Sequence, residues 1–183
     1  GKPDTLSNLL NAKGMKAESY ATSASPTAAQ IDNAVSMAED ADVVIVTTYT
    51  ANTNTAQQNL VNALSQTDKP VIVAAMRNPY DIAVFPDIDA YVTTYGDRDI
   101  SVRALAKVLT GEVNPEGQLP VTIPGQYDFG HGIGYEDIPL SADRIQTFVG
   151  KLEEEGEIID QETARALNIH LTAVARYEDK QLT

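Results

Sequence analysis

Cysteine and tryptophan are both absent from this 183-residue chain, and histidine occurs only twice. Without cysteine the chain can form no disulfide, no thiolate nucleophile and no cysteine-ligated metal site. The two histidines, His131 and His170, stand far apart in the sequence, so we expect no metal site. The lack of tryptophan also argues against a conventional carbohydrate-binding module, although eight tyrosines remain.

Basic residues are scarce as well. Lysine and arginine number 13 against 26 acidic residues, which gives a formal net charge of -13 and a pI of about 4.4. Such an acidic chain repels polyanions, so nucleic acid and anionic membrane surfaces are excluded as partners. No apolar run approaches the ~20 residues that a membrane-spanning helix needs, so membrane insertion is not expected. The chain begins at Gly1 without an initiator methionine, and we expect it to be a piece of a longer protein.

Helical and strand patterns alternate along residues 1–124. Helices are expected over residues 4–12, 55–65 and 100–109, with a short one at 80–84. A further helix is expected to open at Pro26 and Thr27 and to carry Ile31, Val35 and Ala38 on one face. Strands are expected over residues 42–49, 70–76 and 90–95, with a weaker one at 16–22. The run from Asp42 to Tyr49 is rich in β-branched residues without polar alternation, as in strands buried inside parallel sheets. The alternation predicts an α/β fold with a doubly wound, mostly parallel sheet, an α/β sandwich.

The character of the sequence changes after Pro139. Ser141 can cap one helix and Asp160 a second, and each helix carries a single apolar stripe. We therefore expect a C-terminal α-helical hairpin. Two helices cannot bury both stripes alone, so a docking surface for them is expected.

Two glycine-containing runs, the first also rich in proline, carry a resemblance to a known family. Residues 111–124 read Gly-Glu-Val-Asn-Pro-Glu-Gly-Gln-Leu-Pro-Val-Thr-Ile-Pro, with a short strand expected between the last two prolines, and residues 127–135 read Tyr-Asp-Phe-Gly-His-Gly-Ile-Gly-Tyr. Both runs resemble motifs near the end of the C-terminal α/β domain of glycoside hydrolase family 3. The resemblance covers residues 1–139, with the domain's first strand missing. Residues 140–183 resemble a truncated FIMAH module, a helical appendage of secreted and wall-associated bacterial enzymes.

This resemblance implies a parent protein that is a retaining glycoside hydrolase, whose barrel domain carries the nucleophile and most of the sugar specificity. In the β-glucosidase branch the loop after the first long strand tends to carry the acid/base glutamate. Here residues 50–58 contain no carboxylate, which favours the β-N-acetylglucosaminidase branch acting on cell-wall or chitin-type glycans. The chain alone is then expected to be inactive, to pack against the barrel, and to be extracellular or cell-wall associated.

Two other classes of function stay open. The helical hairpin could serve as a docking module for another protein. A flavodoxin-like ligand binder is disfavoured, because no loop combines glycines with a helix start in the form that cradles phosphate.

The loop after the second long strand holds three candidate residues for the substrate cleft or the domain interface: Arg77, Asn78 and Tyr80. Strand-end loops are where α/β sheets bind ligands. A purely structural interpretation is that Asn78 and Pro79 form a turn and that Arg77 pairs with Asp81.

Asp97 and His131 complete the candidates. Asp97 and Asp99 form a carboxylate pair by sequence, but the neighbouring Arg98 and Arg103 keep both ionised, so we interpret their loop as a helix N-cap and domain contact. His131 lies among glycines whose spacing does not match a nucleotide-binding loop. We interpret this segment as a turn in which glycine supplies positive φ while the histidine packs or caps. No catalytic residue, metal ligand or cofactor is assigned.

Overall fold

The computed structural model describes residues 2–85 and 87–135, and beyond these only residues 142, 145–147, 149, 150, 167, 169, 171 and 172. The chain forms two compact units, residues 1–134 and residues 135–183. Within the described part, every helix is too short or too polar to cross a bilayer.

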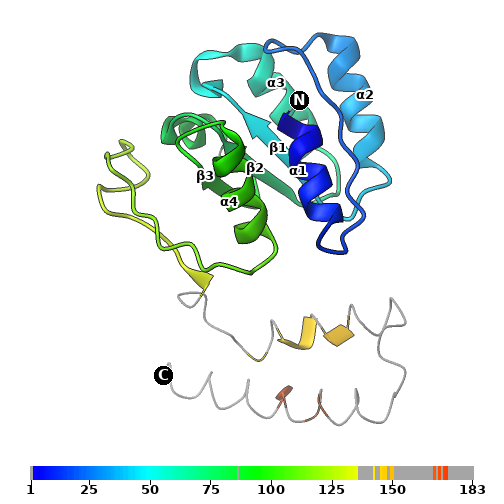
Figure 1. Cartoon of the computed structure of the whole chain (residues 1–183), viewed down its shortest axis with the longest axis vertical. Coiled ribbons are helices and arrows are strands. Elements are labelled where there is room, and N and C mark those ends of the chain that lie inside the picture. The colour runs from blue at the N-terminus through cyan, green and yellow to red at the C-terminus, as the bar shows by residue number, and fades with distance from the viewer. Residues whose placement is uncertain are drawn as a thin grey trace. The chain divides into compact units, whose positions relative to one another are not determined.

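The first unit is built on a parallel three-stranded sheet in the order β1 (Val44–Thr48), β2 (Val71–Ala75), β3 (Ala90–Thr93), as Figure 1 shows. In the register, Val46 lies beside Val73, which lies beside Tyr91. The predicted α/β fold with a doubly wound parallel sheet is confirmed.

Helices cover both faces of this sheet (Figure 1). α2 (Ala28–Ala38) and α3 (Thr55–Ser65) pack on one face, and α1 (Lys2–Asn11) and α4 (Asp99–Leu109) pack on the other. Because strand side chains alternate between faces, successive strand residues join different cores. The core under α2 and α3 includes Val46, Leu60, Val61, Val71, Val73 and Phe85. The core under α1 and α4 includes Leu6, Leu10, Ala74, Met76, Val102 and Leu105.

Local sequence signals account for the helix ends. Thr27 and Gln30 form a reciprocal capping box at the start of α2. Asn54 caps α3, its side chain accepting from two backbone N–H groups of the first turn. After α4, Gly111 adopts a φ of 71°, and its N–H and that of Glu112 donate to the carbonyls of Val108 and Lys107. This is the Schellman arrangement that ends helices at glycine.

The weak strand expected over residues 16–22 does not form, and that prediction is wrong. Ala17 uses its backbone groups elsewhere: its N–H donates to Asn11 Oδ1 at 2.7 Å, and its carbonyl accepts from Asn11 Nδ2 at 2.9 Å. Both groups are occupied by one side chain, so they are not paired with a neighbouring strand.

The short strand expected between Pro120 and Pro124 is also absent. The segment makes one isolated antiparallel bridge, between Ile123 and Tyr127. Proline has no N–H to donate to a ladder, and a proline at each end leaves too few donors for a regular strand. Ile123 is nevertheless buried and anchors the segment.

The second unit is described only in part. Its described residues 142, 145–147, 149 and 150 are helical, as are 167, 169, 171 and 172. Ala142, Val149 and Leu171 form a small buried cluster, and Gln146 donates to the Thr172 hydroxyl at 2.7 Å. The remaining positions of the expected hairpin and of the FIMAH resemblance lie outside the described residues.

Candidate ligand-facing edge of the sheet

The carboxyl ends of three parallel strands meet at one edge of the sheet, which is where open α/β sheets bind ligands. The loops that leave this edge are residues 49–54, 76–81 and 94–99, and we call them the carboxyl edge. The first contains the 3₁₀ helix η1 (Ala51–Thr53), and the second leads into the 3₁₀ helix η2 (Pro79–Val84). Four of the five residues singled out from the sequence lie here, and His131 does not.

Backbone strain is concentrated at this edge. Among the described residues, Thr50 and Tyr95 are the two non-glycine residues with positive φ, at 57° and 53°. Thr50 lies two residues after β1 and Tyr95 two residues after β3. The left-handed region is unfavourable for any residue with a Cβ, and for a β-branched threonine it is a clear outlier. Strain of this kind persists where the surrounding structure holds it, commonly at functional sites.

Asp81 is the buried anchor of the edge, with none of its surface exposed. Its carboxylate accepts a hydrogen bond from the Thr48 hydroxyl at 2.7 Å and another from the Asn52 N–H at 3.0 Å. One side chain of η2 therefore holds both the end of β1 and η1. The expected Arg77–Asp81 pair is wrong, because Asp81 directs both oxygens to these donors.

Arg77 pairs instead with Tyr49. Its Nη1 donates to the Tyr49 hydroxyl at 2.9 Å, and its guanidinium carbon lies 5.1 Å from the centre of the Tyr49 ring. This is within the range of a cation–π contact. Both side chains reach solvent, and Tyr49 is 44% exposed.

Asn78 has the structural role that the turn interpretation gave it. Its side-chain oxygen accepts from the Tyr80 N–H at 2.9 Å and caps η2, with Pro79 at the first position. Tyr80 is left with 38% of its surface exposed at the edge. The Tyr91 hydroxyl donates to the Pro79 carbonyl at 3.1 Å. Burial and the nearby Asp81 charge raise the pKa of that hydroxyl well above its usual value.

Asp97 is exposed on the loop between β3 and α4. The loop does supply the N-cap of α4, but the cap residue is Arg98, whose side chain makes no capping bond. An arginine has no acceptor for the free N–H groups of a helix start. Asp99 lies in the first turn and pairs with Lys2 at 3.4 Å.

His131 lies in a glycine-rich turn. Its ring packs against Tyr127 with the centroids 4.6 Å apart. Gly130 adopts a φ of 84°, and its N–H donates to the Leu119 carbonyl at 2.8 Å. Leu119 in turn donates to the His131 carbonyl at 2.8 Å. Two backbone hydrogen bonds therefore tie this turn to Leu119.

Chemically, the edge offers tyrosine rings and hydrogen-bond donors. Of its carboxylates, Asp81 is buried and occupied, and Asp97 and Asp99 stand on the loop into α4. Among the described residues, no group of histidine, aspartate and glutamate is suited to hold a metal ion. Glycoside hydrolysis commonly requires an acid facing a nucleophile or base across the scissile bond. At the described edge, Asp81 is taken up by Thr48 and Asn52, and Asp99 pairs with Lys2.

Residues 3–148 match the glycosyl hydrolase family 3 C-terminal domain, and the chain belongs to this family. It is 32% identical over 111 residues to a periplasmic beta-glucosidase of Salmonella typhimurium, an alignment that covers 52% of this chain and 14% of that protein. Domains of this family normally pair with an N-terminal catalytic domain.

Two solved structures are similar in fold. A family 3 β-N-acetylglucosaminidase from Paenibacillus sp. superposes with a TM-score of 0.63 at 29% identity, over 66% of this chain and 23% of that one. A fungal multi-domain family 3 β-N-acetylglucosaminidase gives a TM-score of 0.57 at 23% identity, over 80% of this chain and 17% of that one. The chain thus spans less than a quarter of the length of these relatives.

Proposed function

We propose that this chain is the non-catalytic C-terminal domain of a family 3 β-N-acetylglucosaminidase that acts on cell-wall or chitin-type glycans. The observation that carries the proposal is the loop after β1. Residues 50–58 contain no carboxylate, and two of their polar side chains hold the loop: Asn54 caps α3, and Gln57 binds the backbone of Tyr49. The loop therefore offers no proton donor for a glycosidic oxygen. The likeness to the Paenibacillus enzyme supports the same branch.

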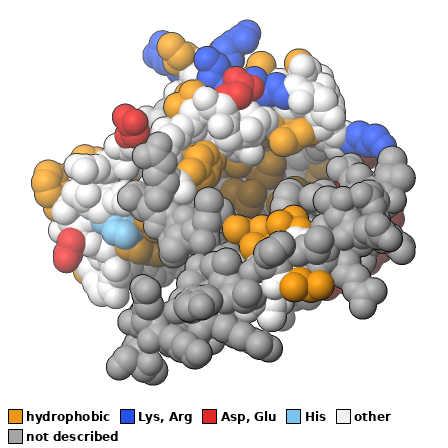
Figure 2. Space-filling view, turned by 90° about the horizontal axis from the view of Figure 1, so that it is seen from below, with side chains coloured by type: hydrophobic (Ala, Val, Ile, Leu, Met, Phe, Trp, Pro, Cys, Tyr) orange, Lys and Arg blue, Asp and Glu red, His pale blue; other side chains and the backbone are white. Residues whose placement is uncertain are grey.

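The domain's physical role would be to pack against a barrel domain of the same parent and to form one wall of its substrate cleft. Arg77, Tyr80 and Asp97 are proposed to face that cleft or the interface. His131 is proposed to lie in the interface itself. Hydrophobic side chains reach the surface at several places (Figure 2), and Phe129 and Ile133 beside His131 are 72% and 58% exposed. Exposed apolar groups of this size favour contact with another protein surface.

A second candidate is a β-glucosidase parent, which the likeness to the Salmonella protein favours. That protein's name also places it in the periplasm. We propose a periplasmic or extracellular location for the parent of this chain in either case.

A third candidate is a docking module that uses the C-terminal helices, as the FIMAH resemblance suggests. Leu167 and Ile169 in this segment are 41% and 62% exposed, which supports a surface that contacts another protein.

The test compares this chain with a longer product in which it follows a barrel domain. Each is assayed with chromogenic β-N-acetylglucosaminide and β-glucoside. Hydrolysis of the first substrate by the longer product alone is the expected result. Preference for the glucoside would favour the second candidate, and activity of the chain alone would overturn the non-catalytic assignment.

A further inference from the structure

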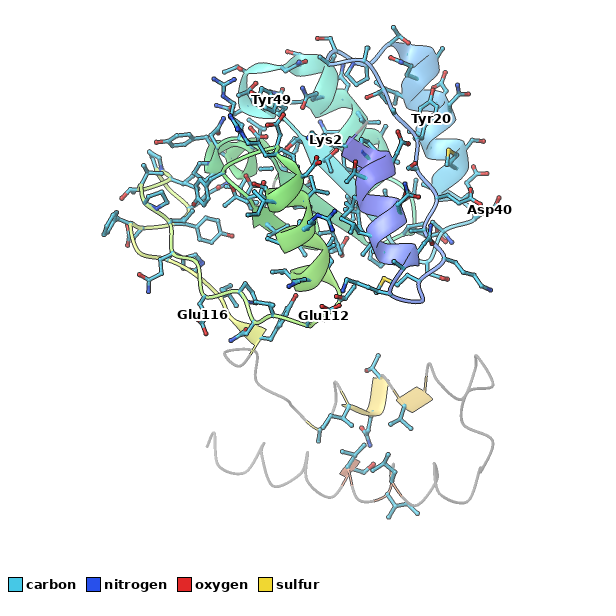
Figure 3. All side chains as sticks on the ribbon, viewed as in Figure 1. Lys2, Tyr20, Asp40, Tyr49, Glu112 and Glu116 are labelled. Carbon is cyan, nitrogen blue, oxygen red and sulfur yellow. The ribbon has the colours of Figure 1, made fainter. Side chains whose placement is uncertain are left out.

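Tyr49 is a partly exposed aromatic residue that directly follows β1. It belongs to neither core cluster of the first unit, and nearly half of its surface is exposed at the end of β1. Figure 3 labels it where the loop toward α3 leaves the sheet. Sequence reasoning did not single it out as a site residue.

The backbone of Tyr49 is nevertheless held on both sides by one buried side chain. Gln57 Oε1 accepts from the Tyr49 N–H at 2.9 Å, and Gln57 Nε2 donates to the Tyr49 carbonyl at 3.2 Å. The same Nε2 donates to the Ala24 carbonyl at 2.9 Å, which fixes the glutamine itself. The Thr50 hydroxyl also donates to the Tyr49 carbonyl, at 2.6 Å, from its strained backbone conformation. An exposed ring on so rigid a support is preorganised, and preorganisation reduces the ordering cost of binding.

Arg77 provides donors beside this ring. One guanidinium nitrogen donates to the Tyr49 hydroxyl, and this hydrogen bond orients the guanidinium group against the ring. A guanidinium has five N–H donors, so others remain for a ligand. Within the described part of the chain, Arg77 makes no ion pair, although the protein carries a net charge of -13.

Other polar and aromatic groups lie at the same edge. Two buried side-chain oxygens in the described chain have no hydrogen-bond partner, Asn52 Oδ1 and Thr93 Oγ1. Asn52 lies in the loop after Tyr49, and Thr93 is the last residue of β3. Tyr80 and Tyr95, from the two neighbouring loops, are 38% and 46% exposed.

From these features we infer that Tyr49 and Arg77 form a saccharide-binding platform. The ring packs against the C–H face of a pyranose, and the guanidinium donates to a hydroxyl or an acetamido carbonyl. This inference rests on the proposed function for its substrate class, a β-linked N-acetylglucosamine chain. It assigns the contact to a residue pair that the catalytic chemistry does not require.

The chemistry of the edge fits a sugar better than a protein partner. Its exposed aromatics are all tyrosines, separated by polar residues such as Thr50 and Asn78. A protein interface has a contiguous apolar core, and the exposed Phe129 and Ile133 elsewhere in the first unit suit that role better.

The experiment titrates the ¹⁵N-labelled chain with tri-N-acetylchitotriose and follows backbone amide shifts. Saturable shifts at Tyr49, Thr50 and Arg77 are expected. Tyr49→Ala should weaken binding by about tenfold, which corresponds to the loss of one aromatic contact of about 1.4 kcal/mol. Tyr49→Phe keeps the ring and should weaken it less. Gln57 binds only backbone atoms of Tyr49, so both variants are expected to keep the fold.

Tyr127→Ala is the matched control, because Tyr127 is a tyrosine of similar exposure on another loop, at 37%. Its affinity should equal that of the unaltered chain. Absence of saturable shifts, or equal binding by Tyr49→Ala, would overturn the platform. A Tyr49→Ala variant that binds the sugar normally but no longer associates with its barrel domain would also overturn the platform, because the edge would then be a protein interface.

Cellotriose separates this inference from the proposed function. If both sugars bind and both affinities fall with Tyr49→Ala, the platform stands without an acetamido preference. If the longer product then cleaves only β-glucosides, the proposed parent activity fails while the platform survives. The longer product could instead cleave β-N-acetylglucosaminides while Tyr49→Ala leaves its KM and the affinity from the titration unchanged. The platform would then fail while the proposed parent activity stands.

Discussion

Gly132 and Gly117 face each other across a close backbone contact, and they should respond in opposite ways to one added methyl group. A Cβ on Gly132 would lie less than 3.0 Å from the Gly117 carbonyl oxygen, whereas ordinary contact begins at 3.4 Å. The obstacle is backbone, so no side chain can rotate away. A Cβ on Gly117 meets no heavy atom within 4 Å. The contact therefore requires glycine on one side only.

The cost of Gly132→Ala follows from what must separate. Moving the two segments apart by roughly 1 Å stretches the Leu119–His131 and Gly130–Leu119 backbone hydrogen bonds, both 2.8 Å long. At about 0.5–1.5 kcal/mol each, their loss costs about 1–3 kcal/mol. Gly117→Ala should be neutral or stabilising by up to about 1 kcal/mol, because alanine restricts the unfolded chain.

Urea unfolding followed by circular dichroism measures the global cost, and amide hydrogen exchange at Leu119 and Gly130 reports local opening. Gly132→Ala should speed exchange at both amides even if the turn detaches without unfolding the sheet. Unchanged exchange at both amides in Gly132→Ala, or an equal loss of stability in Gly117→Ala, would refute the reasoning.

Three further predictions concern the carboxyl edge. Asp81→Ala leaves the Thr48 hydroxyl and the Asn52 N–H without an acceptor and should lower the free energy of unfolding by about 2–4 kcal/mol. Asp87 is exposed, so Asp87→Ala should change the free energy of unfolding by less than about 0.5 kcal/mol in the same urea titration. Gln57→Glu replaces the amide that donates to two carbonyls with an anionic carboxylate that cannot donate. The variant should therefore lose more stability at pH 7 than at pH 4, where protonation of the carboxylate restores a donor. A loss of stability that does not depend on pH would contradict this. Because the pKa of Tyr91 is raised in the folded state, only the unfolded chain loses that proton as the pH rises past about 10. Stability should therefore fall above that pH, an effect that Tyr91→Phe should reduce.

The repetitive part of the fold could be predicted from the sequence because its signals are local. The β-branched runs predicted β1 and β2, and the apolar spacing predicted α3 over residues 55–65 and a helix opening at Pro26 and Thr27, which is α2. The capping bonds of Thr27 and Asn54 were visible only in the structure. The segment at residues 16–22 was predicted wrongly for an equally physical reason. Its pattern allowed a strand, but Asn11 satisfies the Ala17 backbone from outside any ladder. Nothing in the strand pattern itself reveals that competition.

The candidate site was only half predictable. Topology placed Arg77, Asn78, Tyr80 and Asp97 at strand ends, which requires only the order of elements. Their partners could not be read in the same way: Asp81 was expected to bind Arg77, four residues away, but binds Thr48, thirty-three residues away. Contacts between different loops depend on sheet register, which sequence alone does not supply.

Tyr49 shows what signal was available and why it was passed over. It closes a run of β-branched residues, so it could be taken for the last residue of a buried strand. The strand ends one residue earlier, at Thr48, and the left-handed turn at Thr50 follows at once. Tyr49, an aromatic residue that ends in a polar hydroxyl, therefore lies between the buried strand and the strained turn and belongs to neither. Gln57, eight residues later in the first turn of the next helix, holds its backbone there. The combination of a strand-end aromatic and a buried helical glutamine is therefore a pattern that can be sought in sequence, and it locates this edge without reference to any carboxylate.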